Sequence, residues 1–169
     1  DLELDGVQPT LADLGKGRRV LVVDDLDPSR AGLCQKFRAF NFDPVAASSV
    51  TEALEILSRE KIQLVLADEL MPVQGGMELL AAMRADASLR GIPFILMSMI
   101  GANLQEVPGG YRPDLVVLKP LRGRTVGESA DSLLAGNAQR GPLPTLPGTP
   151  ETQCNGSRVL LVEDNPVNQ

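Results

Sequence analysis

Short apolar runs recur along the chain, and each gives way to polar residues. They occupy residues 20–23, 44–47, 64–67, 94–97 and 115–118. Continuous apolar runs of this length are typical of strands that are buried on both faces of a parallel sheet. The pattern therefore predicts five strands, of which the second is the weakest.

Helical signals separate these runs. Asp27 and Pro28 suit the N-cap and the first turn of a helix, and residues 49–52 spell a capping box, Ser-Val-Thr-Glu. Further helices are expected over residues 77–83 and 125–135. Strands that alternate with helices favour an α/β fold, here a doubly wound, five-stranded parallel sheet with right-handed crossovers.

The segment between the fourth and fifth strands departs from this pattern. It contains Pro108, Gly109 and Gly110. Proline clashes with the preceding helical turn, and glycine loses more backbone entropy on folding than any other residue. We therefore expect a short or irregular fourth helix.

The composition divides the chain into four parts. Residues 1–17 are acidic and punctuated by glycine, which predicts an incoming linker, and residues 18–136 hold the predicted domain. Residues 137–157 are rich in Gly, Pro and Thr and predict a second linker. The sequence Arg-Val-Leu-Leu-Val-Glu-Asp in residues 158–169 repeats the first strand at an offset of 139 residues, which predicts the truncated first strand of a second, similar domain.

The net charge and the residue types of the chain exclude several classes of partner and of catalytic group. The net charge of -6 argues against binding to nucleic acid or to anionic lipid. No run of eighteen apolar residues is present, so we expect no direct membrane contact, and two distant cysteines favour the reducing cytoplasm. The chain has no histidine, so its chemistry must use carboxylates, hydroxyls and lysine.

Polar residues that could bind a ligand or take part in catalysis follow the predicted strands. Asp24 and Asp25 follow the first strand, Asp68 the third, Ser98 the fourth and Lys119 the fifth. The carboxyl ends of parallel strands meet at one edge of the sheet, where ligands collect. Three carboxylates there suit Mg²⁺, the lysine can balance a bound oxyanion, and a carboxylate can attack phosphorus.

In order and spacing these positions resemble the receiver domain of response regulators and hybrid histidine kinases, over residues 19 to about 135. The distances are 43 residues from Asp25 to Asp68, 30 from Asp68 to Ser98, and 21 from Ser98 to Lys119. The residues that carry the resemblance are Asp24-Asp25, Asp68-Glu69-Leu70-Met71-Pro72 with Gly76, Ser98, and Lys119-Pro120.

The resemblance implies a flavodoxin-like strand order of 2-1-3-4-5 and a bond before Pro120 that is often cis in the family. It also implies that Asp68 accepts a phosphoryl group from a phosphohistidine. Asp24 and Asp25 would bind Mg²⁺ together with Asp68 and the backbone carbonyl of Leu70.

By the same resemblance, Ser98 is the switch hydroxyl that bonds the phosphoryl oxygen after transfer, and Lys119 pairs with that oxygen. Two positions depart from the family. Met99 replaces a small residue and is expected to crowd the approach to Asp68. Val116 replaces the aromatic residue that moves inward on activation, so we expect the usual coupling to be lost or replaced.

The leading hypothesis is a phosphoacceptor receiver in a bacterial two-component phosphorelay, which regulates a hybrid histidine kinase. Its partners would be a histidine kinase core or histidine phosphotransfer domain, and the second receiver in the same chain. Taken singly, each site residue also fits a simpler interpretation, because aspartate and serine often cap helices or turns and lysine is often solvated.

Two alternatives belong to other classes. A degenerate pseudo-receiver would act by docking or by sensing a ligand, for example a cyclic dinucleotide held by Arg112, Arg122 and Arg124 with Tyr111 nearby. A haloacid-dehalogenase-like phosphatase would use the same kind of aspartate nucleophile. It ordinarily needs a second aspartate two residues later, where this chain has Leu70.

Overall fold

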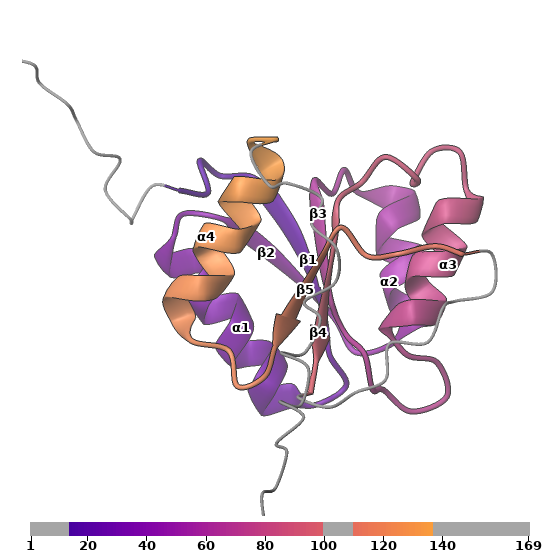
Figure 1. Ribbon diagram of the computed structural model, residues 1–169, viewed down its shortest axis with the longest axis horizontal. Coiled ribbons are helices and arrows are strands. Elements are labelled where there is room, and N and C mark those ends of the chain that lie inside the picture. Colours follow the sequence, from indigo (N-terminus) through magenta and orange to yellow (C-terminus); the bar gives the residue numbers. More distant parts are fainter. Residues whose placement is uncertain (1–13, 100–109, 137–169) are drawn as a thin grey trace, which may run out of the picture.

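A computed structural model describes residues 14–99 and 110–136, which form a parallel sheet between two layers of helices (Figure 1). The sheet has five strands, and their order is β2-β1-β3-β4-β5. The predicted fold class and the strand order implied by the resemblance are both confirmed. The strands are β1 (Arg19–Val23), β2 (Asp43–Ala47), β3 (Leu64–Asp68), β4 (Phe94–Ser98) and β5 (Leu115–Leu118).

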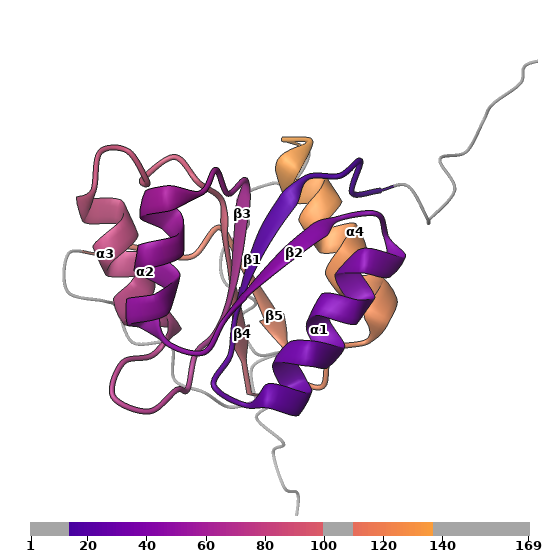
Figure 2. The ribbon, with the colours of Figure 1, turned by 180° about the vertical axis from the view of Figure 1, so that it is seen from behind.

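The helices pack in pairs on the two faces of the sheet. Figures 1 and 2 show α1 and α4 together on one face and α2 and α3 on the other. This arrangement buries the central strands from both sides, since every residue of β3 and β4 is buried. The helices are α1 (Asp27–Ala39), α2 (Val50–Arg59), α3 (Gly76–Ala85) and α4 (Gly123–Leu134).

Each face of the sheet has its own apolar core. Under α1 and α4, the fully buried Phe37 packs with Val22, Leu66 and Met97. Under α2 and α3, Leu21 and Leu96 belong to a cluster with Leu79, Leu80 and Met83. Alternate residues of a strand point to opposite faces, so the continuous apolar runs of the sequence supply both cores.

The first helix begins differently from the prediction. Asp27 is its first helical residue and Leu26 is the N-cap, so the assignment of Asp27 as the cap was wrong. No side chain caps α1, and just before the helix the Asp24 carboxylate accepts from the backbone N–H of Leu26 at 2.9 Å. Asp27 instead places negative charge in the first turn, where the helix dipole favours it.

The second helix begins at its predicted capping box, and α3 begins at Gly76, one residue before the predicted range. Ser49 caps α2 by accepting from the N–H of Glu52 at 3.2 Å, and Glu52 accepts from the N–H of Ser48 at 2.7 Å. The capping box is therefore present, although its return bond is displaced by one residue. Before α3, the Glu78 carboxylate accepts from the N–H of Gly75 at 3.0 Å.

Several predictions fall on residues 1–13, 100–109 and 137–169, outside the described part of the chain. They include most of the incoming linker, the helix break at Pro108 and Gly109, the second linker and the repeated strand in residues 158–169. Within residues 14–99 and 110–136, no helix is long and apolar enough to cross a membrane.

Candidate functional site

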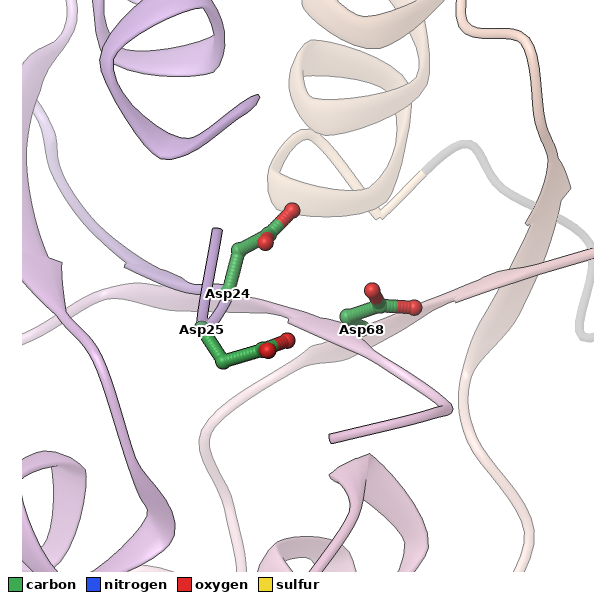
Figure 3. Close-up of side chains that lie close together, drawn as sticks. All are labelled: Asp24, Asp25 and Asp68. Atoms are coloured by element: carbon green, nitrogen blue, oxygen red, sulfur yellow. The ribbon is translucent and has the colours of Figure 1, made fainter. Parts of the chain in front are cut away.

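Three carboxylates meet at the carboxyl edge of the sheet (Figure 3). Asp24 and Asp25 follow β1, and Asp68 is the last residue of β3, which pairs directly with β1. One oxygen of each carboxylate lies within 4.8 Å of the others. The parallel pairing thus brings together the two sequence-distant halves of the predicted acidic cluster.

Asp24 is held rigidly from several sides. It is fully buried, and its two oxygens accept from the N–H of Leu26 at 2.9 Å and the hydroxyl of Ser29 at 2.6 Å. Its backbone carbonyl accepts from Arg30 at 2.6 Å. A buried carboxylate is costly unless it is hydrogen-bonded, so these partners are what allow Asp24 to remain at this position.

Asp68 forms an ion pair with Lys119. The Lys119 ammonium lies 2.6 Å from Asp68 Oδ2, and both side chains are largely buried. Lys119 follows β5, and its N–H donates to the carbonyl of Ser98 at 2.8 Å, which fixes where its side chain begins. The Lys119–Pro120 bond is cis, as the resemblance implies. Asp68 is therefore close to both the acidic pair and a cation.

Ser98 ends β4 and is buried, but its hydroxyl does not bond Asp68. It donates to the Glu69 carboxylate, with a longer contact of 3.3 Å to the carbonyl of Met99. Sequence reasoning gave Glu69 no role. The available signal was a charged residue directly after the expected nucleophile, in a turn that the other site residues surround.

The turn after β3 is tightly packed. The N–H of Glu69 donates to the carbonyl of Met97 at 2.8 Å, and its carbonyl accepts from Gly76 at 3.3 Å. A Cβ on Gly75 would lie 2.2 Å from the Glu69 carbonyl oxygen, and one on Gly76 would lie 2.5 Å from that of Asp68. Only glycine fits both positions, which accounts for the Gly-Gly pair of the sequence.

The two departures from the pattern that the resemblance implies have different surroundings. Met99 is 54% exposed and lines a cavity of about 460 Å³ beside α1, together with Lys36, Lys119 and Pro120. Val116 is half-buried and packs against the core under α2 and α3.

The remaining candidates are solvent-facing or inert. Arg112, Arg122 and Arg124 are exposed, and Arg124 pairs with Glu128 at 2.6 Å on α4. The side chain of Leu70 is 67% exposed, and its N–H lies 3.4 Å from Asp68 Oδ1. Cys34 is buried in the core, and this burial raises the pKa of its thiol, which suppresses the reactive thiolate.

Comparisons with known proteins agree with this geometry. The model of one protein family, the response regulator receiver domain, matches residues 20–119. That range begins in β1 and ends at Lys119, so it holds the acidic cluster together with Ser98 and Lys119.

Curated relatives are similar over the same region. The phosphate regulon transcriptional regulatory protein PhoB of Klebsiella pneumoniae is 29% identical over 92 residues, which are 54% of this chain and 40% of the relative. Two-component response regulator ORR11 of Oryza sativa is 34% identical over 85 residues, 50% of this chain and 58% of the relative. The chain thus spans about half the length of the curated relatives it matches.

Solved structures share the fold. The chemotaxis response regulator CheY4 of Vibrio cholerae superposes with a TM-score of 0.58 at 19% identity, covering 69% of this chain and 98% of that one. A signal receiver domain of a signal transduction histidine kinase from Syntrophus aciditrophicus gives 0.59 at 23% identity, covering 77% and 98%.

Proposed function

Because the chain belongs to the response regulator receiver domain family of two-component systems, we propose that it is a phosphoacceptor and that Asp68 takes the phosphoryl group. The observation that carries the proposal is the position of Asp68. One oxygen of its carboxylate lies within 4.8 Å of oxygens of Asp24 and Asp25, and its Oδ2 lies 2.6 Å from the Lys119 ammonium.

The transfer is a displacement at phosphorus. An oxygen of Asp68 forms the new O–P bond while the N–P bond of a phosphohistidine breaks, and its electron pair returns to the imidazole nitrogen. The donor histidine comes from a histidine kinase or phosphotransfer domain, because this chain contains none. Such a reaction relies mainly on positioning and on charge neutralisation.

The acidic cluster has the donors that Mg²⁺ prefers. Asp24, Asp25 and Asp68 would hold the ion with carboxylate oxygens, and the backbone carbonyl of Leu70 would supply another oxygen. The bound ion would neutralise negative charge on the incoming phosphoryl group. The hydrogen bonds from Leu26 and Ser29 hold Asp24 in place before any ion binds.

Lys119 and Ser98 would act on the transferred group. Lys119 already neutralises Asp68, and an ammonium has three donors, so it can also bond a phosphoryl oxygen. Ser98 would then donate its hydroxyl to another phosphoryl oxygen, which makes it the switch residue. In the structure this hydroxyl donates to Glu69.

We place this domain in a hybrid histidine kinase in the cytoplasm, with residues 1–17 and 137–157 as linkers and residues 158–169 beginning a second receiver. The repeated apolar run and acidic pair support that arrangement. Output would pass to the kinase core or to the second receiver. The net charge of -6 supports an output that is independent of nucleic acid.

A second candidate function is a pseudo-receiver that works by docking or by binding a ligand. The half-buried Val116 favours it, because an aliphatic side chain there cannot supply the aromatic movement that follows phosphorylation. The ligand in that hypothesis is a cyclic dinucleotide. Its phosphates would be bound by the exposed side chains of Arg112, Arg122 and Arg124.

The test is phosphorylation by acetyl phosphate in the presence of Mg²⁺, followed by intact mass. We expect one added phosphoryl group on the wild type and none on Asp68→Asn. Asp43→Asn is the matched control, because Asp43 begins β2 at the opposite edge of the sheet and is exposed. If the wild type gains no mass and binds no beryllofluoride, the phosphoacceptor proposal fails and the pseudo-receiver replaces it.

A further inference from the structure

The Ser98 hydroxyl has a single hydrogen to donate, and Glu69 receives it. Ser98 is 2% exposed, so solvent offers it little alternative. The proposed switch role needs this same hydrogen for a phosphoryl oxygen on Asp68. The Glu69 carboxylate and the phosphoryl group therefore compete for one donor.

The backbone fixes Glu69 where it can compete. Its N–H bonds to the carbonyl of Met97 in β4 at 2.8 Å, one residue before Ser98. On its other side, Gly75 closes so tightly on the Glu69 carbonyl that an added Cβ would lie 2.2 Å away. Since the N–H and the carbonyl of Glu69 are both held, its side chain leaves the turn beside the end of β4.

The negative charge of Glu69 also favours its bond to Ser98 over a phosphoryl group on Asp68. Within residues 14–99 and 110–136, Glu69 has no ion pair, and its carboxylate accepts from the Ser98 hydroxyl. A hydrogen bond to a carboxylate is about twice as strong as one between neutral groups. A phosphoryl group on the neighbouring Asp68 would replace the single negative charge of its carboxylate with about two, and the added charge would repel Glu69.

We propose that Glu69 is a positioning residue that holds the switch hydroxyl away from Asp68 and opposes the phosphorylated state. This inference rests on the proposed phosphoacceptor function. Phosphorylation would then require Ser98 to exchange one acceptor for another, so the pair forms a two-state element at the end of β4. A chain with an uncharged residue at position 69 would retain its phosphorylated conformation more readily.

Glu69→Gln separates the charge from the shape of the side chain. Glutamine keeps an oxygen that can accept from Ser98, but the bond becomes neutral and the repulsion disappears. We expect the affinity for beryllofluoride with Mg²⁺, measured by isothermal titration calorimetry, to rise about fivefold over the wild type. Glu55→Gln is the matched control, since Glu55 is exposed on α2 and its loss should leave that affinity unchanged.

A double-mutant cycle of Glu69→Gln and Ser98→Ala tests whether Glu69 acts through the Ser98 hydroxyl. In the Ser98→Ala background, Glu69→Gln should raise the affinity by less than about twofold, because only the repulsion is left to remove. An effect of equal size in both backgrounds would show that Glu69 acts through charge alone, which contradicts the positioning role. If Glu69 only stabilised the fold, Glu69→Gln would lower the melting temperature. The cycle would then show no coupling energy between Glu69 and Ser98 in beryllofluoride binding.

Acetyl phosphate labelling of the same variants separates this inference from the function on which it rests. If the wild type is labelled on Asp68 and Glu69→Gln binds beryllofluoride no better, the Glu69 inference alone is overturned. If neither the wild type nor Glu69→Gln is labelled or binds, both proposals fail. A wild type that is labelled, together with faster labelling of Glu69→Gln, would support both.

Discussion

The two halves of the site differ in how firmly the fold sets their side chains. In the half built by β1 and β3, Asp24 has hydrogen-bond partners on both oxygens, and glycines pack against the turn after Asp68. In the half built by β4 and β5, the Ser98 hydroxyl is turned to Glu69 and Met99 is mostly exposed. We infer that accepting a phosphoryl group and responding to it depend on separate parts of this domain.

Lys119 is the contact that joins the two halves. It begins after β5, the edge strand, yet its ammonium lies 2.6 Å from the carboxylate that ends β3. The half that departs most from the family pattern therefore still supplies the charge that the other half needs. We therefore expect that a change such as Val116 alters the response while the proposed acceptor remains complete.

Removing that contact should have the largest effect. In Lys119→Met, the phosphoryl group loses its cation, and we expect the rate of acetyl phosphate labelling to fall about a hundredfold, as when one oxyanion donor is lost. Lys36→Met is the matched control, because Lys36 lines the same cavity but donates to the carbonyl of Leu121 at 3.0 Å. An equal loss in both variants would mean that labelling depends on general positive charge.

A substitution in the turn after β3 tests whether the acceptor half is fixed by close packing. In Gly76→Ala, the new Cβ would meet the Asp68 carbonyl oxygen at 2.5 Å and the Leu96 side chain at 2.9 Å. We expect the free energy of unfolding in urea to fall by about 1–3 kcal/mol, as in other overpacked sites.

Gly32→Ala is the control for that experiment. Gly32 lies inside α1, and a Cβ there would meet nothing within 4 Å. Alanine should therefore stabilise the domain, by up to about 1 kcal/mol, through its higher helix propensity. If Gly76→Ala proves equally stabilising, the turn is not close-packed and does not set the position of Asp68.

The sequence was sufficient for the fold and for the membership of the acidic cluster. Apolar runs mark buried strands directly, and parallel pairing then brings Asp24 and Asp68 to one edge. The sequence was insufficient where one side chain has several partners to choose from. Leu26 rather than Asp27 is the N-cap of α1, and the Asp24 carboxylate accepts from the N–H of Leu26. The partner of Ser98 likewise depended on the rotamer of Glu69, which no spacing in the sequence specifies.

The substitution of Met99 has the smallest expected effect. It tests directly whether the β4 and β5 half of the site affects phosphoryl transfer. The sequence predicts that its thioether crowds Asp68, but the side chain is 54% exposed and lines the cavity beside α1. Met99→Ala should therefore change the rate of acetyl phosphate labelling by less than about twofold, as expected for an exposed residue. A much faster rate would show that Met99 shields the acceptor. The β4 and β5 half would then limit phosphoryl transfer itself, and the separation of acceptance from response would not hold.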